Sequence, residues 1–256
     1  MKQIIRVDLF MRIVFCNKII LRFQSGIIFG MLFTSCTFSS HAQDTVLNKY
    51  GLWVLHSLEQ LQQTCLHDSG KAMVNLRRAI PGIVLDLRYA GTNNFMRLRL
   101  YPPLTTTYLR KAAADCLLAV QKELNKNGWG LKIFDAYRPY SVTERMWEPV
   151  QDDRYAADPR KGSGHNRGIA VDLTIIDLAT KKEFDMGTGF DNFSDTAHHA
   201  FTQLSSAVLQ NRQLLKKIME DHGFKALDTE WWHYYLPNSR QYELLDIPFA
   251  RLKKMK

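Results

Sequence analysis

Cysteine is scarce in this chain, and the cysteines that are present form no metal-binding pattern. Only four of the 256 residues are Cys, and none stand at Cys-x-x-Cys spacing. The patterns His-Glu-x-x-His, Gly-x-Ser-x-Gly and the P-loop are also missing. These absences remove the sequence signatures of zinc ribbons, zincins, serine hydrolases and NTPases.

Long apolar runs are lacking as well, and this bears on the N-terminus. Residues 1–24 carry five Lys and Arg among apolar residues, residues 26–33 form a short apolar core, and small residues stand around position 42. That core is well short of the roughly 20 residues that span a bilayer. The pattern is typical of a secretory signal peptide. We therefore expect residues 1–42 to be cleaved and the protein to be exported, in a Gram-negative cell to the periplasm. A lipoprotein anchored through Cys36 is the alternative.

Residues 43–256 would then form one domain with room for a sizeable core. Cys65 and Cys116 remain in it, and they permit either one disulfide or two free thiols. The formal charge of +9 lies mostly at the ends, because five basic residues leave with the leader and four stand in residues 251–256. The body of the domain is close to neutral and has no basic stripe with interleaved aromatics, so we expect neither a nucleic-acid partner nor membrane insertion.

Two stretches far apart in the chain contain the residue types of a hydrolytic metal site. Residues 163–172 read SGHNRGIAVD, and residues 230–233 read EWWH. A catalytic zinc ion usually takes three protein ligands, and a nearby carboxylate that is not a ligand can act as general base. We expect His165, Asp172 and His233 to bind one zinc ion and Glu230 to be the base.

Asp172 lies inside a predicted strand. Residues 168–176 are mostly β-branched and apolar, and alternation places Asp172 on one face and its immediate neighbours on the other. A buried carboxylate without a partner is costly, so a bound cation explains its position. The aromatic residues around Glu230 and His233 predict a second strand. Residues three apart on a strand face opposite sides unless a bulge intervenes, which favours one ligand and one base over two equivalent ligands.

Other histidines lack this context. Some have no acidic or cysteine companion at ligand spacing, and two are adjacent at a predicted helix start, where neighbouring residues do not face a common point. We interpret them as surface or structural residues: His56, His67, His198, His199 and His222.

In combination, the two motifs resemble the VanX-type D-alanyl-D-alanine dipeptidases, zinc metallopeptidases of family M15. The similarity extends from about residue 74 to residue 235 and includes residues 80–90 (IPGIVLDLRYA), 94–95 (NF), 134–139 (FDAYRP) and 185–191 (DMGTGFD). It implies a single α+β domain of the D-Ala-D-Ala metallopeptidase/hedgehog-like fold, with a mainly antiparallel sheet and flanking helices. It also implies hydrolysis of the dipeptide D-alanyl-D-alanine in peptidoglycan metabolism.

The resemblance assigns roles to further residues. It implies that Arg138 polarises the scissile carbonyl, that Asp191 binds the free ammonium group of the substrate, and that Tyr89 and Ser163 make weaker substrate contacts. From the residues alone, without the family resemblance, Arg138 is interpreted as a surface arginine beside a turn and Asp191 as an ordinary acidic residue in a loop. A guanidinium is chemically suited to the first role, because it stays protonated and offers directed donors to an oxyanion.

One loop departs from the family. Where the family continues Thr-Gly after residues 94–95, this chain has residues 96–101 (MRLRLY). Arg97 and Arg99 there either meet a substrate carboxylate or belong to an exposed basic loop. Two other functions stay open: a D,D-carboxypeptidase or L,D-endopeptidase acting on peptidoglycan stems, and a non-catalytic zinc-containing module that binds the wall. A binding module has no need of a base such as Glu230.

Periodicity and capping residues predict the elements of one α+β domain. We expect a helical segment over 55–66 and a long helix over 108–126, capped by Thr106 or Thr107 and stopped at Asn127-Gly128. A short helix is expected after a capping box at 141–144. A further helical region should begin at an Asp195 cap and run toward His222-Gly223. Strands are expected at 83–88, 132–136, 168–176 and about 224–235.

Overall fold

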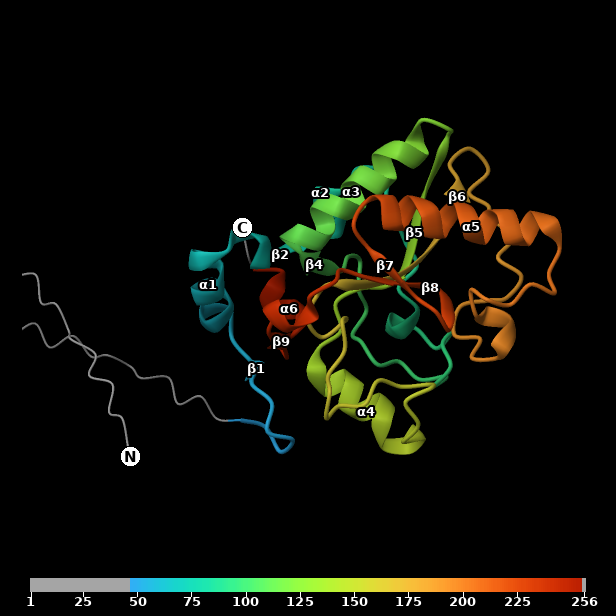
Figure 1. Ribbon diagram of the computed structural model, residues 1–256. Helices are drawn as coiled ribbons and strands as arrows, with labels where there is room; N and C mark the ends of the chain where they lie inside the picture. Colours follow the sequence, from blue (N-terminus) through green and yellow to red (C-terminus); the bar gives the residue numbers. More distant parts are fainter. Residues whose placement is uncertain (1–46, 255–256) are drawn as a thin grey trace, which may run out of the picture. The chain divides into compact units, whose positions relative to one another are not determined.

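The computed structural model describes residues 47–254, which fall within one compact unit, Asp44–Lys256 (Figure 1). The expected signal peptide (residues 1–42), the alternative lipidation site Cys36 and the last two residues lie outside the described residues. Within the described part, no helix combines the length and the apolar character needed to cross a membrane.

A five-stranded sheet forms the centre of this unit, and its strand order is β3-β5-β6-β8-β7. Neighbouring strands are antiparallel except for β3 and β5, which are parallel. The strands are β3 (Val84–Leu85), β5 (Trp129–Asp135), β6 (Ala170–Asp177), β8 (Glu230–Tyr235) and β7 (Lys225–Leu227). The predicted α+β fold with a mainly antiparallel sheet is confirmed.

Helices flank this sheet. The two long helices, α3 (Lys111–Asn125) and α5 (Ser206–Asp221), lie together on one side, and α4 (Tyr140–Val150) lies on the other (Figure 1). Buried residues of α3 and α5 share one apolar core with residues of β5, β6 and β8, whereas α4 packs into a second core. Burial of these apolar faces is the main source of stability for helices of this length.

Shorter elements complete the fold. Two small sheets pair β1 (Val54–Leu55) with β9 (Leu244–Leu245), and β2 (Met73–Asn75) with β4 (Tyr108–Arg110). The remaining segments are helical: α1 (Leu58–His67), α2 (Leu76–Ala79), α6 (Phe249–Leu252) and the 3₁₀ turns η1 (Ser69–Lys71), η2 (Arg88–Ala90), η3 (Asp195–Ala197) and η4 (Ser239–Gln241).

The helix expected over 108–126 begins later than its sequence indicates. Its first three residues form β4, and α3 starts at Lys111, so neither Thr106 nor Thr107 caps it. The reason is tertiary, because β4 pairs with β2, which lies more than thirty residues earlier in the chain. The C-terminal stop is confirmed: α3 ends at Asn125, and Gly128 has φ +75°, a conformation that favours glycine.

Two predicted caps are wrong. Helix α4 begins after Pro139, and the hydroxyl of Ser141 donates to Asp246 Oδ1 at 2.7 Å, which leaves no capping box at 141–144. Asp195 begins the short turn η3. The helix that ends before Gly223 is capped by Ser205, whose Oγ accepts from the Val208 N–H at 3.3 Å.

Two predicted strands also differ in extent. The segment expected as one strand over 224–235 is the hairpin β7–β8, with its turn at residues 228–229. The strand expected over 83–88 is only two residues long and is followed by the turn η2, which carries Tyr89. The helix expected over 55–66 is confirmed as α1, displaced by a few residues.

Candidate active site

The strand register of the central sheet brings two predicted metal ligands side by side. Asp172 in β6 is paired with His233 in β8. Its neighbours along β6 point into the core beneath α3 and α5, so alternation sends Asp172 to the opposite face, as predicted. His165 comes from the loop before β6, which is held close to β5 because the Arg138 N–H donates to the His165 carbonyl at 3.2 Å.

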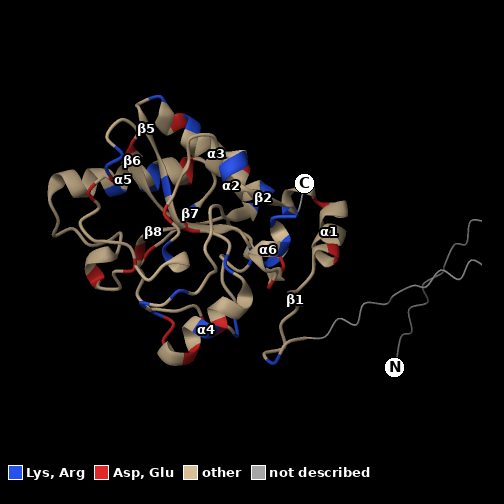
Figure 2. Cartoon of the chain, turned by 180° about the vertical axis from the view of Figure 1, so that it is seen from behind, with Lys and Arg blue, Asp and Glu red and all other residues tan. Residues whose placement is uncertain are grey.

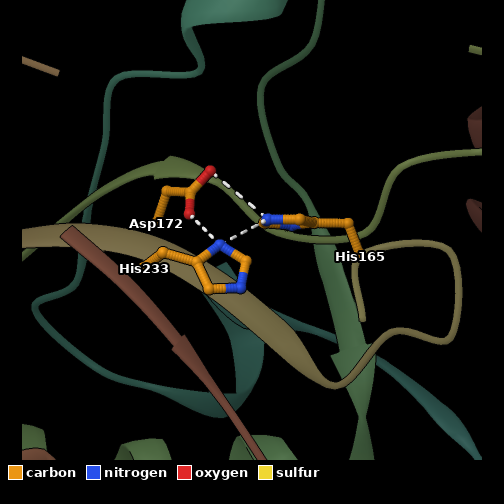
Figure 3. Close-up of side chains that lie close together, drawn as sticks. All are labelled: His165, Asp172 and His233. Carbon is orange, nitrogen blue, oxygen red and sulfur yellow. Dashed lines mark hydrogen bonds and ion pairs between the residues drawn. The ribbon is translucent and has the colours of Figure 1, made fainter. Parts of the chain in front are cut away.

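The side chains of His165, Asp172 and His233 converge on one point (Figure 3). His233 Nδ1 lies 2.9 Å from Asp172 Oδ1 and 3.2 Å from His165 Nε2. His165 Nε2 lies 3.4 Å from Asp172 Oδ2. One donor atom from each residue can be chosen so that all lie within 4.8 Å of one another, which is the arrangement of a three-ligand metal site.

The hydrogen bonds of His165 fit a metal ligand. Its Nδ1 lies 2.7 Å from the carbonyl oxygen of Ala136. A carbonyl only accepts, so Nδ1 carries a proton, and Nε2 faces the donor atoms of the other two residues. Metal-binding histidines are commonly oriented by such a bond from the second ring nitrogen.

The electrostatics of the cluster fit a cation as well. Burial opposes ionisation of Asp172, but the imidazoles of His165 and His233 more than offset this and lower its pKa. Burial also opposes protonation of His233, yet the carboxylates of Asp172 and Glu230 raise its pKa above the ordinary value. Positive charge is therefore stabilised at the point where the three side chains meet.

Glu230 stands beside this cluster and outside the set of three donors. Its Oε2 lies 3.8 Å from His233 Nδ1, and burial raises the pKa of its carboxyl. Both residues line one pocket. The pairing of β7 with β8 shifts register at Ala226/Leu227, and Glu230 lies beyond the residues of β8 that pair with β6.

Arg138 is buried in this pocket instead of lying at the surface. Its Nε and Nη2 donate to Asp135 Oδ2 at 3.1 and 2.8 Å, and its guanidinium lies 5.1 Å from the ring centroid of Tyr89. Burial alone would lower the pKa of Arg138, but Asp135 raises it, so the group stays protonated. The hydroxyl of Tyr101 donates to Asp135 Oδ1 at 2.8 Å and completes a buried chain of polar groups.

Asp135 and Tyr101 were not singled out by sequence reasoning. Asp135 stands three residues before Arg138 in the FDAYRP stretch, and this spacing was an available signal. Tyr101 lies 34 residues before Asp135, and no local pattern links the two.

Asp191 lies in the pocket and is already held by two donors. Its carboxylate accepts the Tyr89 hydroxyl at 3.0 Å and the Phe95 N–H at 3.1 Å, and its backbone has φ +61°. Burial raises the pKa of Asp191 to about 7. An acid that is desolvated and aimed into a pocket is a candidate for binding a positively charged group.

The pocket that contains these groups is small. Its volume is about 210 Å³, below the roughly 300–1,000 Å³ typical of ligand pockets. Ser163 lines it, and its Oγ accepts from the Asn166 N–H at 3.2 Å. Arg97 and Arg99 are exposed and do not line it, which favours the exposed-loop interpretation of those residues.

The cysteines and the remaining histidines of the described chain lie outside the pocket. Cys65 and Cys116 are free thiols, so the disulfide alternative is wrong. His222 Nε2 lies 2.7 Å from Glu123 Oε2, and the ring of His199 stacks edge-on against Tyr234. None of the histidines interpreted as structural lines the pocket.

Comparison with known proteins gives a consistent result. Residues 69–253 match a family model described as D-Ala-D-Ala dipeptidase. The D-alanyl-D-alanine dipeptidase of Escherichia coli strain K12 is 34% identical over 178 residues, which cover 70% of this chain and 91% of that protein. The D-alanyl-D-alanine dipeptidase of Enterococcus faecalis strain V583 is 31% identical over 180 residues, or 63% of this chain and 89% of that protein. Among solved structures, the LdcB LD-carboxypeptidase aligns with 66% of this chain and 70% of its own, at 16% identity and a TM-score of 0.39.

Proposed function

The chain belongs to the D-Ala-D-Ala dipeptidase family, and we propose that it hydrolyses D-alanyl-D-alanine to two molecules of D-alanine with the help of one zinc ion. The observation that supports this most directly is the placement of the Glu230 carboxyl beside three converging ligand atoms, in a pocket that suits only a small substrate.

His165, Asp172 and His233 would hold the metal. Two imidazole nitrogens and one carboxylate oxygen are a ligand set that zinc accepts, and three protein ligands leave a position free for water or substrate. A bound zinc ion would polarise the scissile carbonyl and make a water molecule more acidic.

Glu230 is the proton carrier in this proposal. A raised pKa brings a carboxyl closer to the operating pH, where it can both accept and return a proton. Glu230 takes a proton from the attacking water as the carbon–oxygen bond forms. It then gives this proton to the departing amine as the peptide bond breaks, so water is added across that bond.

Arg138 faces the negative charge that develops on the carbonyl oxygen. Asp135 fixes two of its donor nitrogens and holds the guanidinium in one orientation before substrate arrives. Donors that are already oriented stabilise a transition state without reorganising during the reaction.

Asp191 supplies the specificity for a free amino terminus. As a carboxylate it pairs with the ammonium group of the dipeptide, and Tyr89 and the backbone of Phe95 keep it aimed at the pocket. A substrate with a blocked amine leaves this buried charge without a partner, which is costly. Tyr89 and Ser163 provide the further walls and contacts.

We also propose that the enzyme works outside the cytoplasm, in the turnover or degradation of peptidoglycan peptides. The signal-peptide pattern of residues 1–42 supports this, and so does the substrate, which is a building block of the wall.

The test is an assay of the zinc-loaded protein on three substrates: free D-Ala-D-Ala, N-acetylated D-Ala-D-Ala and a pentapeptide stem. We expect release of D-alanine from the free dipeptide alone, with one zinc per chain by elemental analysis. Replacing His165, Asp172 or His233 by Ala should remove the metal without unfolding the chain, as checked by circular dichroism. Preference for the pentapeptide would instead identify a carboxypeptidase, and absence of hydrolysis with full zinc content would identify a binding module.

A further inference from the structure

A groove on another part of the unit shares no lining residue with the active-site pocket. It lies between β2 with the adjoining α2, the loop 102–106 and α6, and its volume is about 630 Å³. This is well within the size range of ligand-binding sites. We call it the basic groove.

The floor of the basic groove is apolar and its rim is positively charged. Buried side chains of Met73, Tyr108 and Phe249 form part of the floor. Arg77, Arg78 and Lys253 line the rim, and none of the three forms a salt bridge with a described residue. No Asp or Glu of the described chain lines the groove. Figure 2 shows Lys and Arg gathered around α2, β2 and α6.

One edge of β2, a strand that lines the groove, is unpaired. Val74 lies opposite Leu109 in the β2–β4 pair. Two residues further along on each side, the Leu76 N–H donates to the Thr107 carbonyl and the Lys111 N–H donates to the Ala72 carbonyl. This pattern turns the N–H groups of Met73 and Asn75 away from β4. In this register β4 bonds neither N–H, and neither has a backbone partner outside the strand pair among the described residues.

The same stretch of β2 lines the groove. Met73 and Asn75 point to one face of β2 and Val74 to the other, yet all three line the groove. The unpaired edge belongs to this strand. Such an edge accepts an added strand from another chain through its main-chain groups.

From these observations we propose that the basic groove binds an extended acidic peptide segment of a partner protein. The segment adds as a strand to the edge of β2, its apolar side chains lie on the floor formed by Met73, Tyr108 and Phe249, and its carboxylates pair with the rim cations. The free strand edge favours a peptide over a lipid, because lipids offer no complementary ladder of N–H and C=O groups.

The experiment measures binding of a fluorescein-labelled hexapeptide of alternating glutamate and valine to the purified protein by fluorescence anisotropy. The control peptide has glutamine in place of glutamate. We expect saturable binding of the acidic peptide, at least tenfold weaker binding of the neutral one, and weaker binding at higher salt. Equal binding of the two peptides, or no saturation with the acidic one, would overturn the proposal.

Charge-reversal variants locate the site. Arg77→Glu with Arg78→Glu should weaken peptide binding by about tenfold or more, the loss expected when two ion pairs become repulsive. The matched control is Lys122→Glu with Lys126→Glu at the end of α3, two exposed cations outside the groove, and it should leave binding unchanged. Equal effects of the two double variants would show only a general response to net charge and would contradict peptide binding in the basic groove.

Hydrogen exchange tests the strand addition. The bound peptide should slow exchange at the Met73 and Asn75 amides, and excess D-Ala-D-Ala should not displace it. Binding without this protection, displacement by the dipeptide, or preference for phosphatidylglycerol vesicles over the peptide would each overturn the proposed mode. Dipeptide hydrolysis should be the same in the Arg77/Arg78 variant and in the unmodified protein. Peptide binding in the groove and dipeptide hydrolysis are therefore tested independently of each other.

Discussion

Glu230 is the side chain whose replacement should separate metal binding from hydrolysis. Glu230→Gln keeps the shape of the side chain and leaves the three converging donors intact, so zinc content should not change. Because the amide cannot accept a proton from water, kcat should fall by about 10²–10⁴-fold, the usual contribution of general acid–base catalysis. Steady-state kinetics together with metal analysis checks both points, and full activity of this variant would refute the role of Glu230.

Tyr101 should act on catalysis through Asp135 and Arg138. Tyr101→Phe removes one hydrogen bond to Asp135, worth about 0.5–1.5 kcal/mol of stability, and loosens the orientation of the Arg138 guanidinium. We expect a lower kcat with little change in KM or zinc content. The matched control is Tyr137→Phe, which loses a buried hydroxyl bonded to Ile247 and lies outside the pocket lining. If both variants lowered kcat equally, the effect of Tyr101 would be on stability alone.

Asp191 should give the enzyme a dependence on pH near neutrality. Its pKa is raised to about 7, so the free enzyme carries a neutral acid there below this pH and a carboxylate above it. Only the carboxylate pairs with an ammonium group, and kcat/KM for the free dipeptide should therefore rise as the pH passes upward through about 7. Asp191→Asn should lower kcat/KM at high pH and remove this part of the profile. An identical profile in the variant would argue against an ammonium-binding role.

Individual residue roles were predictable to different degrees. The clustering of His165, Asp172 and His233 could be predicted from residue type and spacing, because a carboxylate inside an apolar strand needs a partner and few residue types provide one. Asp135 and Tyr101 could not, since only the tertiary fold brings Tyr101 to the end of β5. Burial of Arg138 likewise depends on packing beneath Tyr89 and not on its own neighbours in sequence.

Among the elements, those whose own sequence contains the helix or strand signal were predicted best. Strand β6 is mostly apolar, and α3 and α5 end within three residues of a glycine with positive φ. Elements defined by distant partners were predicted poorly. Strand β4 exists because β2 pairs with it, and the hairpin turn between β7 and β8 contains neither Gly nor Pro to mark it.

The loop before β6 should be sensitive to small changes, because it carries His165. A Cβ added at Gly164 would stand 2.8 Å from the Cβ of Ala170, an atom that cannot rotate away. Gly164→Ala should therefore shift the loop, weaken zinc retention and destabilise the protein by about 1–3 kcal/mol. Thermal unfolding and metal content after dialysis against a weak chelator measure both effects.

The control for this loop is Gly128→Ala at the end of α3. Nothing lies within 4 Å of the added methyl group, but φ is +75°, so the variant should lose stability through backbone strain alone. Its zinc content should be unchanged. Equal loss of metal in both variants would mean that the loop has no special part in holding His165.

The chain as exported should be shorter than the chain as translated. Expressed in its own host, the protein should begin near residue 43, as expected for a cleaved signal peptide. Mass spectrometry of the intact protein, purified from the envelope fraction, gives the mature N-terminus. A mature chain that begins at a lipidated Cys36 would support the lipoprotein alternative, and an intact leader in the cytoplasmic fraction would contradict export.

The two free thiols, Cys65 and Cys116, have a consequence for where this enzyme can mature. They pack against different apolar cores, and the described domain holds no disulfide that an oxidising compartment would have to supply. The same domain can therefore reach its native state with or without an oxidant. Under the export proposal, residues 1–42 alone would then set the compartment, so that a chain without them should fold to a working enzyme in the cytoplasm.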